Sequence, residues 1–258
     1  MSTGGNLEAA RLGNAPRILA IGQSHLAALI RAHQLNNNQP ANLTFLMLKQ
    51  TAFQPRIQDG VLNVELAAAI DNAAPDVTIA AIAGNEHSVL GLTNHPQPFD
   101  FVLPQEPELP LARDAEILPS GIVAAWMRQR LAERSFPLMR LIRAQLRGPI
   151  WALEPPPPQP DEEHIRSYAE PVFQDLISRR GIAPRTFRYK LWRLQSLLLK
   201  EFYAASGIGF IPVPDGCQDE NGMLAKDYWG SDATHANASF GRLILGVITG
   251  LLASGADS

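Results

Sequence analysis

The stretch RILAIGQSH, residues 17–25, indicates the fold class of this 258-residue chain. Its first part, residues 17–22, is a short apolar run that ends in glycine and predicts a buried strand. The residues that follow, 25–33, carry apolar side chains at helical spacing and predict a helix. A buried strand that passes directly into a helix is typical of α/β proteins with a parallel sheet.

The same alternation of apolar runs and helical patterns continues along the chain. Further strands are predicted at residues 43–48, 77–83, 149–154 and 208–213. Helices are predicted at residues 62–72, 121–134, 137–147, 161–180 (with a kink at Pro171), 185–205 and 236–252. This order predicts a three-layer α/β/α, flavodoxin-like, doubly wound parallel sheet of about five strands, which binds ligands beyond the carboxyl ends of its strands.

The domain organisation follows from the positions of these elements. Residues 1–15 are polar and predicted to be a flexible N-terminus, and residues 16–258 are predicted to form a single domain. The segment 91–148 begins with a proline-rich stretch without clear periodicity and continues into two arginine-rich helical patterns. We interpret it as a helical and loop insertion after the third strand that could act as a lid.

Composition excludes several classes of function. The formal net charge of −3 disfavours a dedicated nucleic-acid-binding protein. The single cysteine, Cys217, cannot form a disulfide within the chain or a cysteine-based zinc site, and no His-Glu-x-x-His spacing indicates a metal. The arginines of residues 128–147 are interpreted as a solvated helix surface, in preference to a contact with membrane lipid. Without a signal-peptide core or a long apolar span, the protein is expected to be soluble and cytoplasmic.

Short polar groups follow three of the predicted strands, at residues 22–25, 84–87 and 232–235. The carboxyl ends of parallel strands share one edge of the sheet, so these groups are expected to converge. Ser24 is the candidate nucleophile, His235 the base that takes its proton, and Asp232 the carboxylate that orients the imidazole. The backbone of Ser24, the side chain of Asn85 and the backbone of Gly60 are the candidate oxyanion donors.

Each of these residues also has an ordinary structural interpretation. Ser24 and Asn85 could cap helices, Asp232 and His235 could form a surface pair, and Gly60 could serve a turn. The joint pattern favours the catalytic interpretation. Two further histidines, His25 and His87, adjoin candidate site residues and are candidates for substrate contact.

The three polar groups resemble the conserved blocks of the SGNH (GDSL-type) hydrolase family. The first block reads Ile21-Gly22-Gln23-Ser24-His25, and the third reads Ala83-Gly84-Asn85-Glu86. The last has the form Asp-x-x-His and reads Asp232-Ala233-Thr234-His235, and it is the most specific match. Gly60 corresponds to the glycine of the second block. The resemblance implies ester or acyl hydrolysis without a metal or other cofactor, with the triad and oxyanion hole named above.

Two positions depart from the family pattern. Gln23 stands where the family has aspartate before the nucleophile, and Glu86 stands where it has aspartate after the asparagine. Neither belongs to the implied triad. The leading hypothesis is therefore a serine esterase acting on a small-molecule or glycan ester, such as a carbohydrate or lipid O-acyl group. An acyltransferase and a non-catalytic SGNH-like binding protein remain alternatives, whereas a nucleotide-binding module lacks the Gly-x-Gly-x-x-Gly signature.

Overall fold

The computed structural model describes residues 15–35 and 42–255, and its centre is a parallel sheet. Five strands form this sheet in the order β2-β1-β5-β8-β9, and every pairing is parallel. They are β1 (Ile18–Gly22), β2 (Leu43–Met47), β5 (Val77–Ala81), β8 (Ile150–Leu153) and β9 (Gly209–Ile211). The order reverses beside β1, which confirms the predicted doubly wound, flavodoxin-like topology.

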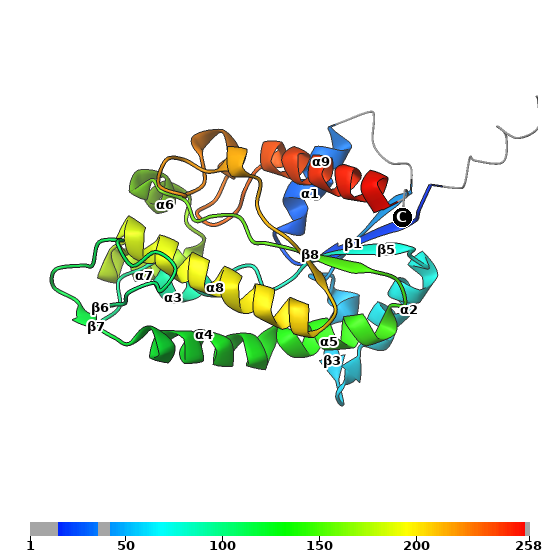
Figure 1. Ribbon diagram of the computed structural model, residues 1–258, viewed down its shortest axis with the longest axis horizontal. Coiled ribbons are helices and arrows are strands. Elements are labelled where there is room, and N and C mark those ends of the chain that lie inside the picture. Colours follow the sequence, from blue (N-terminus) through cyan, green and yellow to red (C-terminus); the bar gives the residue numbers. More distant parts are fainter. Residues whose placement is uncertain (1–14, 36–41, 256–258) are drawn as a thin grey trace, which may run out of the picture.

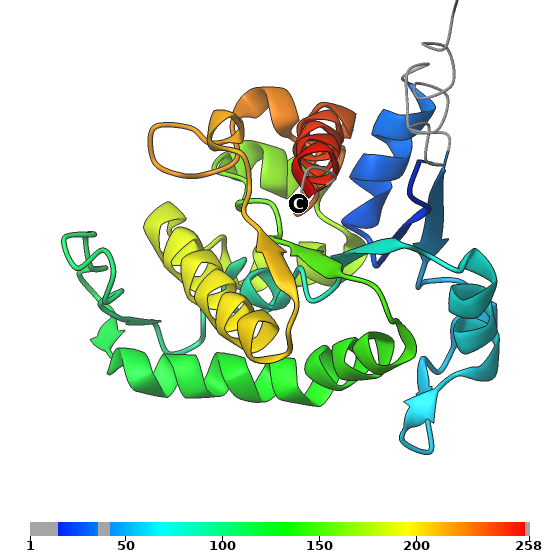
Figure 2. The same ribbon diagram turned by 45° about the vertical axis from the view of Figure 1, so that its right-hand side comes forward.

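Helices cover both faces of the sheet (Figures 1 and 2). The helices are α1 (Leu26–Gln34), α2 (Val64–Ala73), α3 (Glu86–Gly91), α4 (Ser120–Arg134), α5 (Phe136–Gln145), α6 (Glu162–Tyr168), α7 (Pro171–Arg180), α8 (Arg185–Ala205) and α9 (Ala238–Gly255). Helices α1 and α9 lie on one face, while α2, α5 and α8 lie on the other. Within the described residues, none of these helices is both long and apolar enough to cross a membrane.

Short elements complete the connections between strands and helices. Strands β3 (Ile57–Gln58) and β4 (Val61–Leu62) form an antiparallel hairpin, and β6 (Phe99–Asp100) pairs with β7 (Glu116–Ile117). Single 3-10 turns lie at Thr51–Phe53, Asp215–Cys217 and Lys226–Tyr228. The expected flexible N-terminus lies almost wholly outside the described residues.

The strands are apolar because the sheet has a hydrophobic core on each of its two faces. Leu19 and Ile21 of β1 pack into a cluster with α2, α5 and α8, and Ile18 and Ala20 pack into a second cluster with α1 and α9. Because neighbouring residues of a strand point to opposite faces, both sets must be apolar. The continuous apolar run that identified β1 in the sequence is therefore the signature of a strand buried on both faces.

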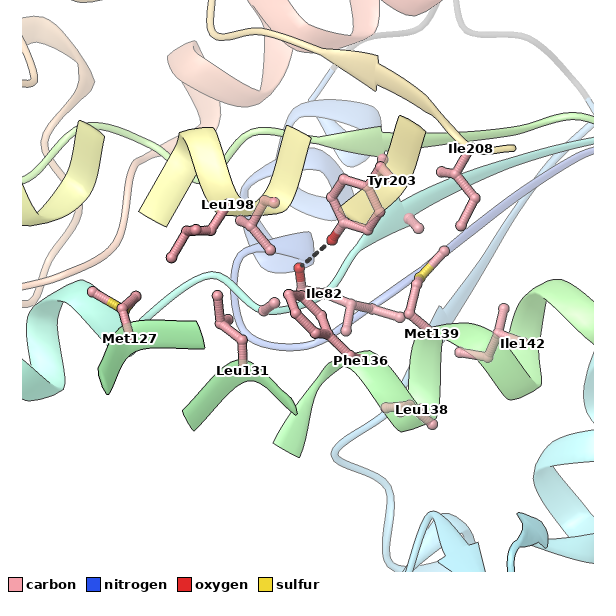
Figure 3. Close-up of a cluster of buried hydrophobic side chains, with 14 of the residues drawn as sticks. Ile82, Met127, Leu131, Phe136, Leu138, Met139, Ile142, Leu198, Tyr203 and Ile208 are labelled. Carbon is pink, nitrogen blue, oxygen red and sulfur yellow. Dashed lines mark hydrogen bonds between the residues drawn. The ribbon is translucent and has the colours of Figure 1, made fainter. Parts of the chain in front are cut away.

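The segment 91–148 contributes to the core on the α8 side. Both α4 and α5 pack against α8, and Figure 3 shows Met127, Leu131, Phe136 and Met139 gathered beneath that helix. All four side chains are buried. The two helices at the end of this segment therefore belong to the helical layer itself. This packing explains why apolar residues lie between their arginines in the sequence.

A buried ion pair fastens the first half of that segment to α8. Lys190 is fully buried, and its Nζ lies 3.0 Å from both carboxylate oxygens of Asp100 and 2.9 Å from the carbonyl oxygen of Pro110. Asp100 also accepts hydrogen bonds from the backbone N–H groups of Phe101 and Ala112. Both buried charges thus have the several partners that burial demands.

The proline-rich run after β8 ends that strand, and it is also buried inside the protein. Residues 154–160 are all buried. Prolines have no N–H group, so the segment has few backbone donors to satisfy. Several of its carbonyl oxygens accept hydrogen bonds from side chains of α8. Trp192 donates to the Pro155 carbonyl at 3.0 Å, and Arg188 donates to the carbonyls of Gln159 and Pro160.

The helix predicted at residues 161–180 is two helices, α6 and α7. Asp161 caps α6 as its position suggests, because its side chain accepts a hydrogen bond from the His164 N–H at 2.7 Å. Pro171 begins α7 instead of kinking a continuous helix. A proline fits the first turn of a helix, where its missing N–H costs nothing, and this favours a new start over a kink.

Replacing Asp100 by asparagine is expected to lower the free energy of unfolding by about 3–5 kcal/mol, because it leaves the buried Lys190 charge without a counterion. Urea unfolding of the Asp100→Asn variant measures this. Glu201→Gln is the matched control, because it breaks an exposed 3.4 Å pair with Arg128 and should cost less than about 1 kcal/mol. Equal effects of the two substitutions would contradict the structural importance of the buried pair.

Candidate active site

Ser24 lies in the turn between the end of β1 and the start of α1. The turn is fixed by backbone hydrogen bonds from Gln23 N–H to Ala81 and from Ala27 N–H to Ser24. Gly22 is required just before it, because a Cβ on this residue would lie only 2.6 Å from the carbonyl oxygen of Ala81. The neighbouring strand β5 thus approaches too closely for any side chain at this position.

His235 and Asp232 form the second part of the site, on the loop that precedes α9. The Nδ1 atom of His235 lies 2.9 Å from both carboxylate oxygens of Asp232. Asp232 also accepts the backbone N–H groups of Thr234 and His235, each at 2.9 Å. The local turn therefore holds the carboxylate against the imidazole, as the Asp-x-x-His spacing predicts.

The charge of Asp232 is well supported by these contacts. Partial burial raises the pKa of its carboxyl group, but the hydrogen bonds from His235 and Thr234 lower this pKa by a larger amount. The net result is a pKa well below the usual range. The carboxylate is ionised at neutral pH and fixes the His235 proton on Nδ1. Nε2 is left as the ring nitrogen that can accept a proton.

Asn85 lies at the exit of β5, where the backbone takes an unusual course. Ala83 has a φ of +71°, a left-handed conformation that costs free energy in any residue with a side chain. Two buried residues of α8 hold this segment: Gln195 donates to the Ala83 carbonyl at 2.8 Å, and Tyr203 donates to the Ile82 carbonyl at 3.2 Å (Figure 3). The position of Asn85 is thus set by a helix more than 100 residues away in sequence.

A pocket of about 220 Å³ brings these residues together. Ser24, His25, Asn85 and His235 all line it. No hydrogen bond joins Ser24 to His235 in the described part of the chain, although they share the pocket. Such contacts often tighten only when substrate binds. The convergence predicted for the three strand ends is therefore observed, with Asp232 behind His235.

Gly60 does not reach this pocket. It lies at the exposed tip of the β3–β4 hairpin with a φ of +78°, next to Asp59 at +52°, and it serves the turn. The connection after β2 contributes Lys49 and Arg56 to the pocket instead. Sequence reasoning missed these two residues, because isolated basic residues in a loop carry no motif that distinguishes them from surface charges.

The two candidate contact histidines have different positions. His25 lines the pocket, and its ring lies 4.9 Å from the ring of His235. His87 is buried against α8, where Gln195 accepts from its backbone N–H at 2.6 Å and lies 3.2 Å from its Nδ1. The structure therefore places His25, and not His87, beside the site residues.

The departure at Glu86 also has a structural explanation. Its carboxylate is buried and accepts a 2.8 Å hydrogen bond from Nε of Arg130 on α4. The longer side chain thus links the β5 exit to the 91–148 segment. The 91–148 segment is joined to the site by this ion pair, but none of its described residues lines the pocket.

Known proteins match this chain in overall structure. No protein-family description matches the chain, and no curated protein matches it in sequence. A solved structure from Bacteroides fragilis, named as an acylhydrolase, is 13% identical with a TM-score of 0.51 and covers 99% of both chains. A GDSL-like lipase from Bacteroides thetaiotaomicron is 12% identical with a TM-score of 0.46, over 96% of this chain and 95% of its own. The inhibitor-bound aryl esterase of M. smegmatis is 13% identical with a TM-score of 0.45, over 93% and 99%.

The chain shares its fold with the acylhydrolase from Bacteroides fragilis. The sheet order and the match over nearly the whole chain agree on this point, and they confirm the three-layer, doubly wound fold predicted from the order of strands and helices. Within the described residues, no group of three or more His, Cys, Asp or Glu side chains is placed to hold a metal ion.

Acid is expected to destabilise this fold through two histidines whose imidazole rings are buried. Burial lowers the pKa of His87 to about 4 and that of His25 to about 3, the latter aided by the nearby His235 and His87. Unfolding restores the ordinary pKa, so the unfolded chain binds more protons between these values and about 6.5, and stability falls as the pH falls through this window.

From about pH 7 to about pH 5, His87 alone is expected to lower the free energy of unfolding by about 2 kcal/mol. Urea unfolding at both pH values measures this. The His87→Asn variant keeps an N–H group near Gln195 and should lose this contribution of about 2 kcal/mol to the pH dependence of stability. The control His95→Asn, at an exposed position, should keep the pH dependence of the unmodified protein. Identical pH dependence in His87→Asn and the unmodified protein would contradict a neutral buried His87.

Proposed function

We propose that this protein is a serine hydrolase that cleaves an ester through an acyl-enzyme on Ser24. The observation that supports this most directly is the single pocket shared by Ser24, Asn85 and His235, with Asp232 bound to the far nitrogen of the imidazole. This arrangement supplies a nucleophile, a base with a defined tautomer and an oxyanion donor. The fold shared with an acylhydrolase adds support.

In the proposed mechanism, His235 Nε2 accepts the Ser24 proton as Oγ attacks the ester carbonyl. The tetrahedral intermediate then collapses, the bond to the alcohol oxygen breaks, and His235 returns the proton to the departing alcohol. Water next attacks the acyl-enzyme, with His235 taking one proton from it and giving it back to Ser24 as the acid leaves. Asp232 stays ionised and stabilises the imidazolium that forms in each step.

The developing oxyanion is proposed to bind to the backbone N–H of Ser24 and the side-chain amide of Asn85. Among the described residues, neither group has another hydrogen-bond partner, so both are available to a ligand. Gly60 is not included, because it lies outside the pocket. The pocket is smaller than the roughly 300–1,000 Å³ of pockets that hold drug-sized ligands, which favours a compact acyl group.

A fluorophosphonate probe tests the nucleophile. Ser24→Ala is expected to abolish both covalent labelling and hydrolysis of an aryl acetate, because the attacking oxygen is lost. Ser88→Ala is the matched control, since it removes another serine of the same pocket and labelling should persist. Labelling that survives in Ser24→Ala would exclude this residue as nucleophile. Folded, unlabelled wild-type protein would favour a binding protein, and acyl transfer to an added alcohol in place of water would favour an acyltransferase.

The Asn85→Ala variant tests the oxyanion donor. Loss of one such donor typically lowers turnover by about 10²–10³-fold, and we expect kcat for an aryl acetate to fall by that order with a smaller change in KM. Steady-state kinetics measure this. Asn221→Ala, in an exposed loop, should retain wild-type kcat. An unchanged kcat in Asn85→Ala would remove this side chain from the proposed mechanism.

A further inference from the structure

We propose that the pocket is selective for esters that carry an anionic group, such as a carboxylate, sulfonate or phosphate, which Lys49 and Arg56 bind. This inference rests on the proposed esterase function and specifies its substrate class. Both side chains line the pocket together with Ser24 and His235.

The two cations reach the pocket from one side. Lys49 lies two residues after the end of β2, and Arg56 lies in the loop before the β3–β4 hairpin. Strand β2 is the sheet edge next to β1, the strand that carries Ser24. Both positive charges therefore come from the connection that follows the strand adjacent to β1, and they border the volume that a bound ester would occupy.

Neither cation has a carboxylate partner in the described part of the chain. The carbonyl oxygen of Leu48 accepts a 3.3 Å hydrogen bond from Nε of Arg56, which orients the guanidinium group and leaves its terminal nitrogens available. In contrast, Arg130 and Arg193 are paired with glutamates at 2.8 and 3.0 Å. Unpaired cations in a concave site attract anionic ligands, and a guanidinium group fits carboxylate or phosphate oxygens well.

One acidic side chain, Glu170, also lines the pocket, and it comes from a different element. It precedes α7 and lies near Phe173, which lines the pocket too. Glu170 has no ion-pair partner among the described residues. The pocket thus carries two positive charges from the β2 side and one negative charge from the α7 side. This difference in sign allows a test in which substitutions have opposite effects.

An alternative role for the cations would be general stabilisation of the oxyanion. In that case, neutral and anionic esters would lose activity equally when a cation is removed. The ratio of kcat/KM for an anionic ester to that for its neutral analogue separates the two roles. Selective binding changes this ratio, whereas oxyanion stabilisation leaves it constant.

The experiment measures this ratio for two substrate pairs. In the first, 4-acetoxybenzoate and 4-acetoxybenzamide differ in the charge of the alcohol part. In the second, phenyl hemiglutarate and phenyl pentanoate differ in the charge of the acyl part. A ratio above unity for one pair only shows on which side of the ester the anion binds.

Lys49→Gln and Arg56→Gln are each expected to lower the ratio of the preferred pair by about two- to five-fold, and the double variant by about ten-fold. Glu170→Gln should raise the ratio, because it removes the opposing charge. Lys200→Gln, at an exposed position of α8, is the matched control and should leave the ratio unchanged. The wild-type ratio should also shrink between about 0.01 M and about 1 M salt, since ions screen partly exposed charges.

A ratio that stays the same in the double variant, or a wild-type protein without preference in either pair, would overturn the inference while leaving the esterase proposal intact. If no ester is cleaved, the proposed function fails instead. Saturation-transfer NMR with 4-hydroxybenzoate and 4-hydroxybenzamide then decides the inference without turnover. Stronger binding of the benzoate that is lost in the double variant supports anion selectivity, and equal binding overturns it.

Discussion

The hydrogen bonds that Gln195 makes from α8 to the exit of β5 hold together much of this structure. The fully buried side chain donates to the carbonyl of Ala83 and accepts from the backbone N–H of His87, on either side of Asn85. Left-handed backbone at a residue such as Ala83 costs on the order of 1–3 kcal/mol unless its surroundings enforce it. A buried amide that satisfies two backbone groups provides that enforcement, because breaking the contact would leave unpaired polar groups in the core.

The position of α8 depends in turn on the segment between α3 and β8. The buried Lys190–Asp100 pair joins its first half to α8, and the apolar faces of α4 and α5 fill the layer beside that helix. Glu86 and Arg130 add a direct link from the β5 exit to α4. The region that looks irregular in the sequence is therefore a support for the site, at a distance from the pocket itself.

The site combines local and distant contacts. Asp232 and His235 meet within one turn of chain, so their hydrogen bond needs no other part of the protein. Ser24 and Asn85 reach the same pocket only because β1 and β5 are neighbours in a parallel sheet and end at the same edge. The close approach of these strands at Gly22 fixes the distance between their two polar ends. Chemistry at this edge is thus a consequence of sheet geometry.

Features that depend on short-range periodicity and spacing could be predicted from the order of residues alone. Strands buried on both faces are continuous apolar runs, and the Asp-x-x-His spacing places Asp232 beside His235, because each of these effects acts over a few residues. Three other outcomes required the folded chain: Lys49 and Arg56 line the pocket, Gly60 lies at an exposed hairpin tip, and His87 is buried against Gln195. Those outcomes depend on loop paths and on packing between elements far apart in the chain, and such contacts leave no periodic pattern in the sequence.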